Sequence, residues 1–281
     1  MVDIHEVQRV MTDKEARALI GEDVPAREIT CNKPGIYVDA ETLEPVFIYL
    51  PMPSKVAELR ASVLNLKMTT TPRANGVSNV SRTFGMAPRK PVMRREACTA
   101  TTMSTDQPDS HSVLVDLGDV FTKMMFDLLP ETTAANLETV NQILPEWRMT
   151  DESLWTSGVV NRSSTLPYHL DRANFPTWSA MPVVRRGMRG GYLDIPEYNL
   201  VCACRDGYVS FFVGQQLVHG VTPMTPQAKD SYRYSVVYYA LRGMKDCFTT
   251  AIEQKRAKAT RSNREDNMAI DDSISVTEED A

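Results

Sequence analysis

Apolar residues recur every three or four positions in three stretches of the first half of the chain. One covers residues 54–67 and starts at Ser54, whose hydroxyl can cap a helix. The second covers 112–128 and includes two adjacent methionines, and the third covers about 134–144. This spacing places the apolar side chains on one side of a helix, so each stretch is predicted to be an amphipathic helix that packs on a core.

Shorter elements precede these helices. Thr12 and Glu15 have the spacing of a capping box, which predicts a helix over residues 13–20. Residues 36–38 and 45–50 are rich in β-branched and aromatic side chains and are predicted to be strands.

From Trp155 onward the pattern changes to short apolar runs separated by turn residues. These runs predict strands at 158–160, 183–184, 192–195, 200–204, 208–213, 217–219 and 232–241. Arg205-Asp206-Gly207 is typical of a hairpin, and Gly190-Gly191 indicates a tight turn or a close approach of backbone. Helices first and strands later favour an α+β, mainly β domain, built as an antiparallel sandwich or barrel braced by N-terminal helices.

Two segments lack such a pattern. Residues 69–110 are rich in Thr, Arg, Pro and Ser, and we expect a long surface excursion with little regular structure. Residues 249–281 lose the apolar pattern and end in acids, which predicts a frayed helix followed by a disordered tail. We therefore expect one domain over residues 1–248, with support in about 1–150 and a strand-rich core in about 151–248.

The composition fits a globular protein with one sizeable core, since 42% of its 281 residues are hydrophobic. The chain has no apolar run long enough to span a membrane and no signal-peptide pattern, so we expect a soluble, cytoplasmic protein with no membrane partner. Its five cysteines form no C-x-x-C pair, so neither a disulfide framework nor structural zinc is expected. Cys202 and Cys204 are interpreted as small apolar filler on one face of a strand.

Charge is unevenly distributed. The formal net charge is −5, but residues 265–281 hold seven acids and no Lys or Arg, which leaves 31 basic and 29 acidic residues in 1–264. The first basic run comprises Arg73, Arg82, Arg89, Lys90, Arg94 and Arg95, and the second comprises Arg185, Arg186 and Arg189. Charge runs are usually solvated surface, but these two lie on either side of His169 and Asp171, which are considered below as metal ligands, and they suit a polyanion such as nucleic acid.

The chain has four histidines, which limits the choice of metal ligands. His5 lies near the terminus and His111 in the polar excursion, whereas His169 and His219 border predicted strands. His169 and Asp171 form a His-x-Asp triplet. Two imidazoles and one carboxylate can occupy one face of an octahedral Fe(II) and leave the other positions for a co-substrate and dioxygen.

Arg233 follows His219 by fourteen residues and lies on the last predicted strand. A guanidinium matches a carboxylate geometrically, so Arg233 is suited to hold the far carboxylate of a bidentate acid co-substrate. His-x-Asp alone is a common tripeptide, and its combination with a later His and Arg is the stronger signal. Together these residues indicate oxygen chemistry at iron.

Five motifs between Trp155 and Leu241 carry a resemblance to a known family. They are Thr156-Ser-Gly-Val-Val-Asn-Arg162, Tyr168-His-Leu-Asp-Arg-Ala-Asn174, Arg189-Gly-Gly-Tyr-Leu193, Leu217-Val-His-Gly220 and Arg233-Tyr-Ser235. The chain resembles the TET/J-binding-protein (JBP) branch of the Fe(II)- and 2-oxoglutarate-dependent dioxygenases, which hydroxylate the 5-methyl group of a pyrimidine in nucleic acid. A looser likeness extends to Arg73-Ala-Asn-Gly76 and Phe84-Gly-Met-Ala-Pro-Arg89.

The resemblance implies a double-stranded β-helix core (jelly roll, cupin-like) and the cofactors Fe(II), 2-oxoglutarate and O2, with ascorbate assisting. The implied iron ligands are His169, Asp171 and His219. The implied 2-oxoglutarate contacts are Arg233, Ser235 and Arg162.

The implied substrate is DNA with a methylpyrimidine flipped out of the duplex, first 5-methylcytosine and second thymine. Asn174, five residues after His169, matches the TET residue that faces the flipped base, and Asn161 is a weaker candidate. Asparagine also commonly caps loops, which is the alternative role for both. The implied phosphate contacts are Arg89, Arg94 and Arg95.

The chain departs from animal TET proteins, because it lacks their zinc-binding cysteine clusters and a separate DNA-reading domain. It is similar in this to compact bacteriophage-encoded members, for which the location would be the host-cell cytoplasm. Two alternatives stay open. One is a hydroxylase of a protein side chain or small metabolite, and the other is a catalytically silent β-helix that serves as a binding module.

Overall fold

The computed structural model describes residues 2–72, 78–93 and 95–279. Its strands are β1 Ile4–Val7, β2 Gly35–Asp39, β3 Pro45–Pro51, β4 Thr69–Pro72, β5 Ser78–Ala87, β6 Thr99–Ala100, β7 Ser157–Arg162, β8 Leu166–His169, β9 Ser179–Arg186, β10 Met188–Gly190, β11 Leu193–Ile195, β12 Leu200–Cys202, β13 Tyr208–Phe212, β14 His219–Val221, β15 Met224–Pro226 and β16 Tyr232–Tyr239. Its α-helices are α1 Asp13–Ala18, α2 Val56–Asn65, α3 Met103–Asp106, α4 Pro108–Leu128, α5 Pro130–Val140 and α6 Thr250–Glu279. Its 3-10 helices are η1 Pro91–Met93, η2 Pro145–Trp147, η3 Pro196–Tyr198 and η4 Arg242–Asp246.

Two sheets packed face to face form the core. Within the described residues, ten strands make the larger sheet, in the order β1-β2-β3-β13-β9-β16-β7-β5-β4 with β6 beside β5. Four strands make the smaller sheet, in the order β12-β11-β14-β8. Tyr49 and Phe212 of the larger sheet belong to one buried cluster with Leu193 and Leu200 of the smaller sheet. This arrangement is a double-stranded β-helix, and it confirms the predicted fold class.

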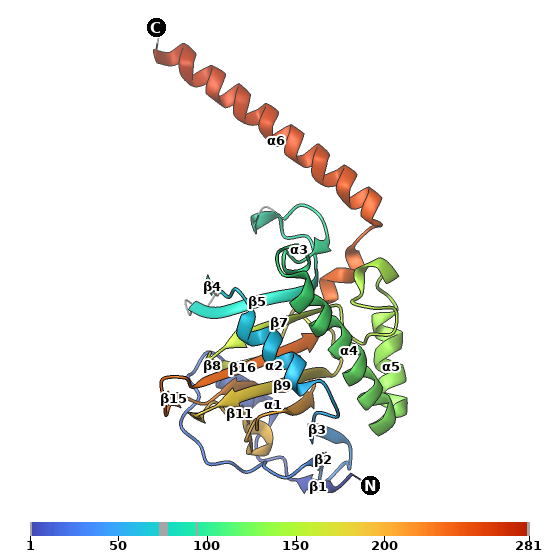
Figure 1. Cartoon of the computed structure of the whole chain (residues 1–281). Helices are drawn as coiled ribbons and strands as arrows, with labels where there is room; N and C mark the ends of the chain where they lie inside the picture. The colour runs from blue at the N-terminus through green and yellow to red at the C-terminus, as the bar shows by residue number, and fades with distance from the viewer. Residues whose placement is uncertain (1, 73–77, 94, 280–281) are drawn as a thin grey trace.

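Helices cover the outer face of the larger sheet (Figure 1). Leu59 of α2 and Phe121 of α4 belong to one buried cluster with Phe84 and Tyr238 of the sheet. The Tyr238 hydroxyl donates a hydrogen bond of 2.8 Å to the carbonyl oxygen of Leu114, also on α4. Because the helices occupy this face, the opposite face of the sheet is left to the interior between the two sheets.

The predicted helices are present with shifted ends. The capping box is confirmed, because the Thr12 hydroxyl accepts from the N–H of Glu15 and the Glu15 side chain accepts from the N–H of Thr12. α4 and α5 each begin four residues before the predicted start, at a proline whose missing N–H has no helical partner in the first turn anyway. The predicted cap at Ser54 is wrong, since α2 begins at Val56 and its preceding residue Lys55 makes no side-chain cap bond.

The expected irregular excursion over residues 69–110 is also wrong. This segment contributes β4, β5 and β6, and β5 pairs with β7 so that Phe84 lies opposite Gly158. A Cβ atom at Gly158 would lie 2.1 Å from the buried Phe84 ring, so the glycine makes room for that ring. β5 holds few β-branched residues, and its strand conformation follows from pairing with β7 rather than from its own composition.

Two turns predicted from glycine have different outcomes. Arg205-Asp206-Gly207 does not close a hairpin, because β12 before it belongs to the smaller sheet and β13 after it to the larger one. The close approach at Gly190-Gly191 is confirmed. Both glycines have positive φ, and a Cβ atom at Gly190 would lie 1.9 Å from the carbonyl oxygen of Pro223.

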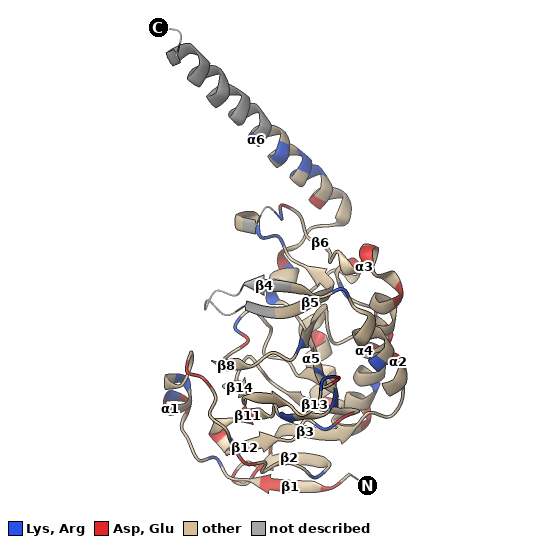
Figure 2. Ribbon diagram, turned by 60° about the vertical axis from the view of Figure 1, so that its left-hand side comes forward, with Lys and Arg blue, Asp and Glu red and all other residues tan. Residues whose placement is uncertain are grey.

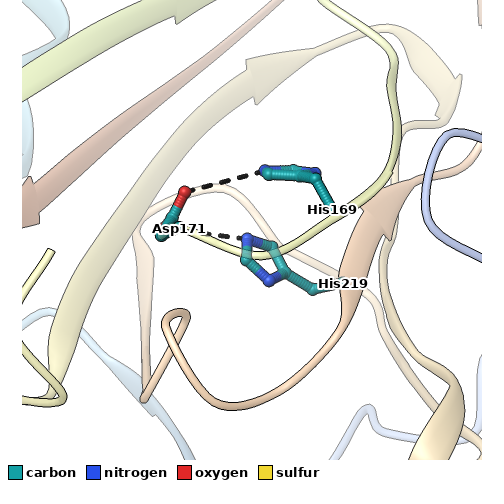
Figure 3. Close-up of side chains that lie close together, drawn as sticks. All are labelled: His169, Asp171 and His219. Atoms are coloured by element: carbon teal, nitrogen blue, oxygen red, sulfur yellow. Dashed lines mark ion pairs between the residues drawn. The ribbon is translucent and has the colours of Figure 1, made fainter. Parts of the chain in front are cut away.

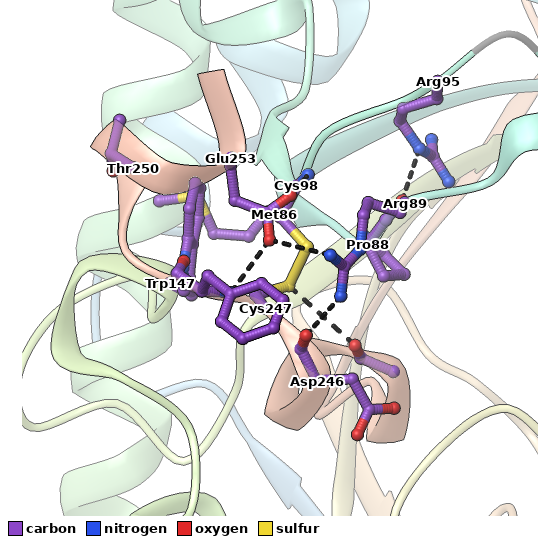
Figure 4. Close-up of a disulfide and its surroundings, with 12 residues drawn as sticks. Met86, Pro88, Arg89, Arg95, Cys98, Trp147, Asp246, Cys247, Thr250 and Glu253 are labelled. Atoms are coloured by element: carbon purple, nitrogen blue, oxygen red, sulfur yellow. Dashed lines mark hydrogen bonds and ion pairs between the residues drawn. A yellow bond between two sulfur atoms is a disulfide. The ribbon is translucent and has the colours of Figure 1, made fainter. Parts of the chain in front are cut away.

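The expectation that no disulfide forms is wrong. Cys98 and Cys247 are joined, although 149 residues separate them in the sequence (Figure 4). Neither cysteine has a partner nearby in sequence, so only the fold brings the two thiols together. The bridge ties the segment before β6 to the segment that leads into α6.

α6 is one continuous helix over Thr250–Glu279 that extends away from the body, where a frayed helix and a disordered tail were expected (Figure 1). Its sequence contains many good helix formers, among them Ala, Lys, Arg, Gln and Glu. Among the described residues, no helix combines the length and apolar character needed to cross a membrane.

Candidate metal centre

His169, Asp171 and His219 point toward one another (Figure 3), and His219 is buried whereas the other two are partly exposed. His169 ends β8 and His219 begins β14, and the two lie directly opposite each other with ring centroids 4.3 Å apart. The Nε2 atoms of both histidines lie 3.8 Å from oxygens of Asp171, Oδ1 for His169 and Oδ2 for His219. One ligand atom from each residue falls within 4.8 Å of the others. The fold therefore brings the three predicted ligands close enough together to be candidates for holding one metal ion.

Backbone carbonyls determine which ring nitrogen of each histidine is protonated. His169 Nδ1 lies 2.8 Å from the carbonyl oxygen of Pro167, and His219 Nδ1 lies 2.9 Å from that of Leu217. A carbonyl only accepts hydrogen bonds, so each Nδ1 is the donor. The lone pair of each neutral ring is then on Nε2, which is the atom that faces Asp171 and is free to bind a metal ion.

Burial keeps the His219 ring neutral. Desolvation, followed by the neighbouring His169, lowers the pKa of His219 to about 4. At neutral pH the imidazole is therefore unprotonated, which is the form that binds a metal ion.

Gly214 leaves space for the carboxylate ligand. A Cβ atom at this position would lie 2.7 Å from Asp171 Oδ2 and 3.2 Å from His219 Cε1. The Gly214 carbonyl also accepts a hydrogen bond of 2.9 Å from the N–H of Asp171, so the two residues are held together. The role of this glycine is not evident from the sequence, because a single glycine between strands carries no local information about which residues it contacts.

Two buried acids support the histidines from behind. Asp194 accepts a hydrogen bond of 2.9 Å from the hydroxyl of Tyr168, and Glu197 accepts one of 2.8 Å from the N–H of Val218. Tyr168 precedes His169, and Val218 precedes His219. Burial raises the pKa of both Asp194 and Glu197. Neither role is evident from the sequence, since both acids are far from their partners along the chain.

Arg233 is 1% exposed and, among the described residues, has no anionic partner of the kind that such a buried cation normally has. Its Nη1 donates to the Ser235 hydroxyl at 3.3 Å, but Nε and Nη2 have no hydrogen-bond partner among the described residues. Leaving these donors unpaired costs free energy unless a ligand pairs with them. A carboxylate fits the geometry of the two free donors, so the residues present fit a dicarboxylate co-substrate such as 2-oxoglutarate.

Arg185 lies opposite Arg233 on the neighbouring strand β9 and adds to the positive charge there. Its guanidinium donates to backbone carbonyls, among them those of Met188 and Gly190. Burial, followed by the charge of Arg233, lowers the pKa of Arg185. The prediction that Arg185 belongs to a polyanion-binding surface patch is therefore wrong, because its guanidinium is hydrogen-bonded to backbone carbonyls of the protein itself.

The asparagines and Arg162 lie near these groups. Asn174 is buried, and its N–H donates to the carbonyl of Asp171 at 2.9 Å. Asn161 is buried on β7 directly opposite Ser235, and the next residue, Arg162, is exposed at the end of that strand. The predicted roles of these three residues stay predictions.

Much of the first basic run is engaged within the protein. Arg82 pairs with Asp106 at 2.6 Å, Arg89 pairs with Glu253 at 3.2 Å, and Arg95 donates to the carbonyl of Pro88. These contacts argue against a direct contact of Arg89 and Arg95 with phosphate. The remaining predicted phosphate contact, Arg94, lies outside the described residues, as does Arg73.

Comparison with known proteins finds likeness in structure alone. No protein-family model and no curated protein matches the sequence. The fold is similar to that of NgTET1 in complex with 5mC DNA, with a TM-score of 0.59, 15% identity, and coverage of 87% of this chain and 84% of that one. It is also similar to a 2OG-Fe(II) oxygenase family oxidoreductase from Burkholderia pseudomallei, with a TM-score of 0.51, 19% identity, and coverage of 77% of this chain and 100% of that one. The chain thus has a fold that 2OG-Fe(II) oxygenases use.

Proposed function

We propose that the protein is an Fe(II)- and 2-oxoglutarate-dependent dioxygenase that hydroxylates the 5-methyl group of a pyrimidine in DNA, with 5-methylcytosine as the first substrate and thymine as the second. The observation that carries the proposal is that one fold holds both three candidate metal ligands and a buried Arg233 with two hydrogen-bond donors that have no partner among the described residues. A binding module without chemistry has no need for either feature.

In this proposal each residue has a defined task. His169, Asp171 and His219 hold iron(II), and Arg233, assisted by Ser235, binds the distal carboxylate of 2-oxoglutarate. When bound, iron(II) and 2-oxoglutarate would supply the activation of O2, in which one oxygen atom ends in succinate as 2-oxoglutarate loses CO2 and the other is inserted into a methyl C–H bond. The protein's share is to orient these groups and to exclude water from the interior between the sheets.

DNA is favoured as substrate by the likeness to NgTET1, whose structure was solved with 5mC DNA. A methyl group inside a duplex cannot reach an iron between two sheets, so the base must leave the stack. Asn174 is a candidate to read that base, since its backbone is bonded to that of the ligand Asp171.

The test is mass spectrometry of nucleosides after incubation with Fe(II), ascorbate, 2-oxoglutarate and duplexes that contain either 5-methylcytosine or thymine as the methylated base. We expect the nucleoside to gain one oxygen atom in a reaction that depends on 2-oxoglutarate. We expect no gain with the His219→Ala variant, whose circular dichroism spectrum should match that of the wild type and show that it is folded. Turnover of 2-oxoglutarate without oxidation of either base would reject DNA and favour a protein or metabolite hydroxylase.

A second variant tests base reading separately from metal binding. We expect Asn174→Ala to retain iron and to lose rate or selectivity between the two bases. Unchanged rates on both bases would remove Asn174 from the substrate site.

A further inference from the structure

The first turn of α6 is fixed to the body of the protein. The buried carboxylate of Glu253 accepts hydrogen bonds from the N–H groups of Cys98, at 3.0 Å, and Phe248, at 2.8 Å, and also pairs with Arg89 (Figure 4). The disulfide to Cys247 holds the same segment. The helix therefore leaves the body in a defined direction rather than from a loose linker.

The base of α6 is also joined to the loop that carries a metal ligand. The N–H of Arg242, in η4 just before α6, donates to the carbonyl of Ala173 at 3.0 Å, and its guanidinium donates to the carbonyl of Arg172, also at 3.0 Å. Arg172 directly follows Asp171. A molecule that contacts α6 is thus held by the same framework that presents the iron ligands.

Lys and Arg residues, blue in Figure 2, are frequent on the first half of α6. The cations between Thr250 and Arg264 are Lys255, Arg256, Lys258, Arg261 and Arg264, and all are exposed. The single acid in this stretch is Glu253, which is buried and already paired.

Among the described residues, only part of this positive charge is neutralised. Arg261 and Arg264 share one carboxylate, that of Glu96. Lys255 and Lys258 have no ion-pair partner in the part of the chain that the structure describes. Cations held on a rigid helix with a deficit of acids form a surface that suits a polyanion.

We propose that the first half of α6, from Lys255 to Arg264, contacts the phosphate backbone of duplex DNA. The inference rests on the proposed function for the identity of the polyanion. The ten residues span about 15 Å of helix, a length along which a duplex carries about nine phosphate charges. This surface takes the role that sequence analysis gave to residues 72–95, where Arg82, Arg89 and Arg95 are bound internally.

The test compares two double variants of the full chain. Lys255→Gln/Lys258→Gln removes two cations from α6, and Lys14→Gln/Lys33→Gln removes two exposed cations elsewhere, one in α1 and one just before β2. Binding to an unmethylated 30-base-pair duplex is measured by fluorescence anisotropy at several salt concentrations. For the α6 variant we expect weaker binding and a slope of log K against log salt that is smaller by about 1.8, since each phosphate contact contributes about 0.9. The control should match the wild type.

Equal affinity and equal slope for the α6 variant and the wild type would overturn the proposal. A second result would also overturn it: sedimentation shows a dimeric wild type and a monomeric α6 variant, while DNA binding is unchanged. The basic half of α6 would then pair with the acidic half of α6 in a second copy of the chain. Because the probe carries no methylcytosine, binding is scored independently of oxidation. If the protein oxidises DNA but the α6 variant binds DNA like the wild type, this inference alone is rejected. If DNA binding depends on α6 but no base is oxidised, the proposed function alone is rejected.

Discussion

Glu197 is hydrogen-bonded to the backbone of Val218, whose N–H donates to the Glu197 carboxylate at 2.8 Å. Val218 immediately precedes the candidate iron ligand His219, and Glu197 is 2% exposed. The buried side chain of Glu197, in the 3-10 helix η3, thereby fixes the backbone next to His219. Support of this kind commonly affects how tightly a metal ion is bound.

Two substitutions of Glu197 should show whether its hydrogen bond to Val218 or its negative charge matters for stability and iron binding. Glu197→Ala leaves the Val218 N–H buried and unpaired, which should lower the free energy of unfolding by about 1–3 kcal/mol and weaken iron binding. Glu197→Gln keeps an acceptor and should restore both, because burial already disfavours the charged carboxylate by raising its pKa. Urea unfolding and iron titration measure the two effects. Unchanged iron affinity in the alanine variant would show that Glu197 does not position His219.

A methyl group at Gly214 should disturb the metal site directly. The Cβ atom of Gly214→Ala would lie 2.7 Å from Asp171 Oδ2, so the carboxylate must move. We expect iron affinity to fall by about 10–100-fold, as for other disturbances beside metal ligands. Gly118→Ala is the matched control, since its Cβ meets nothing closer than 3.6 Å. Equal iron affinity of both variants and the wild type would disprove the steric role of Gly214.

Arg233 should determine affinity for the co-substrate. Arg233→Lys keeps the charge but loses the two-donor geometry, so the KM for 2-oxoglutarate should rise by about tenfold or more while iron affinity is retained. Arg186→Gln is the control, because Arg186 lies on the neighbouring strand β9 but is exposed and pairs with Asp230 at 2.7 Å. The readout is 2-oxoglutarate turnover at varied co-substrate concentration. An unchanged KM in Arg233→Lys would exclude this arginine from the co-substrate site.

Reduction of the disulfide should destabilise the fold. The Cys98–Cys247 bridge closes a loop of 149 residues, and its loss should lower the free energy of unfolding by about 2–4 kcal/mol. Urea unfolding with and without dithiothreitol measures this difference. Cys98→Ser/Cys247→Ser should be as unstable as the reduced wild type and insensitive to the reductant. A wild type that does not respond to dithiothreitol would contradict a structural role for the bridge.

Features encoded over a few neighbouring residues were predictable from the sequence. The Thr12 capping box depends on residues three apart, and the close approach at Gly190 follows from the conformational freedom of glycine. His169 and Asp171 are two residues apart, so the local sequence predicts that they act together, and the chemistry of imidazole and carboxylate makes a metal site the hypothesis.

Contacts between residues far apart in the chain depend on the three-dimensional fold. The sequence does not reveal that Glu197 meets Val218, that Cys98 meets Cys247, or that β5 pairs with β7. It also does not reveal that Arg89 is paired with Glu253, which moves the proposed DNA contact from the first basic run to α6. A charged residue or a cysteine looks the same in the local sequence whether or not it forms an ion pair or a disulfide in the folded protein. Partnership depends on register and packing between sheets and helices, and these are determined only when the whole chain folds.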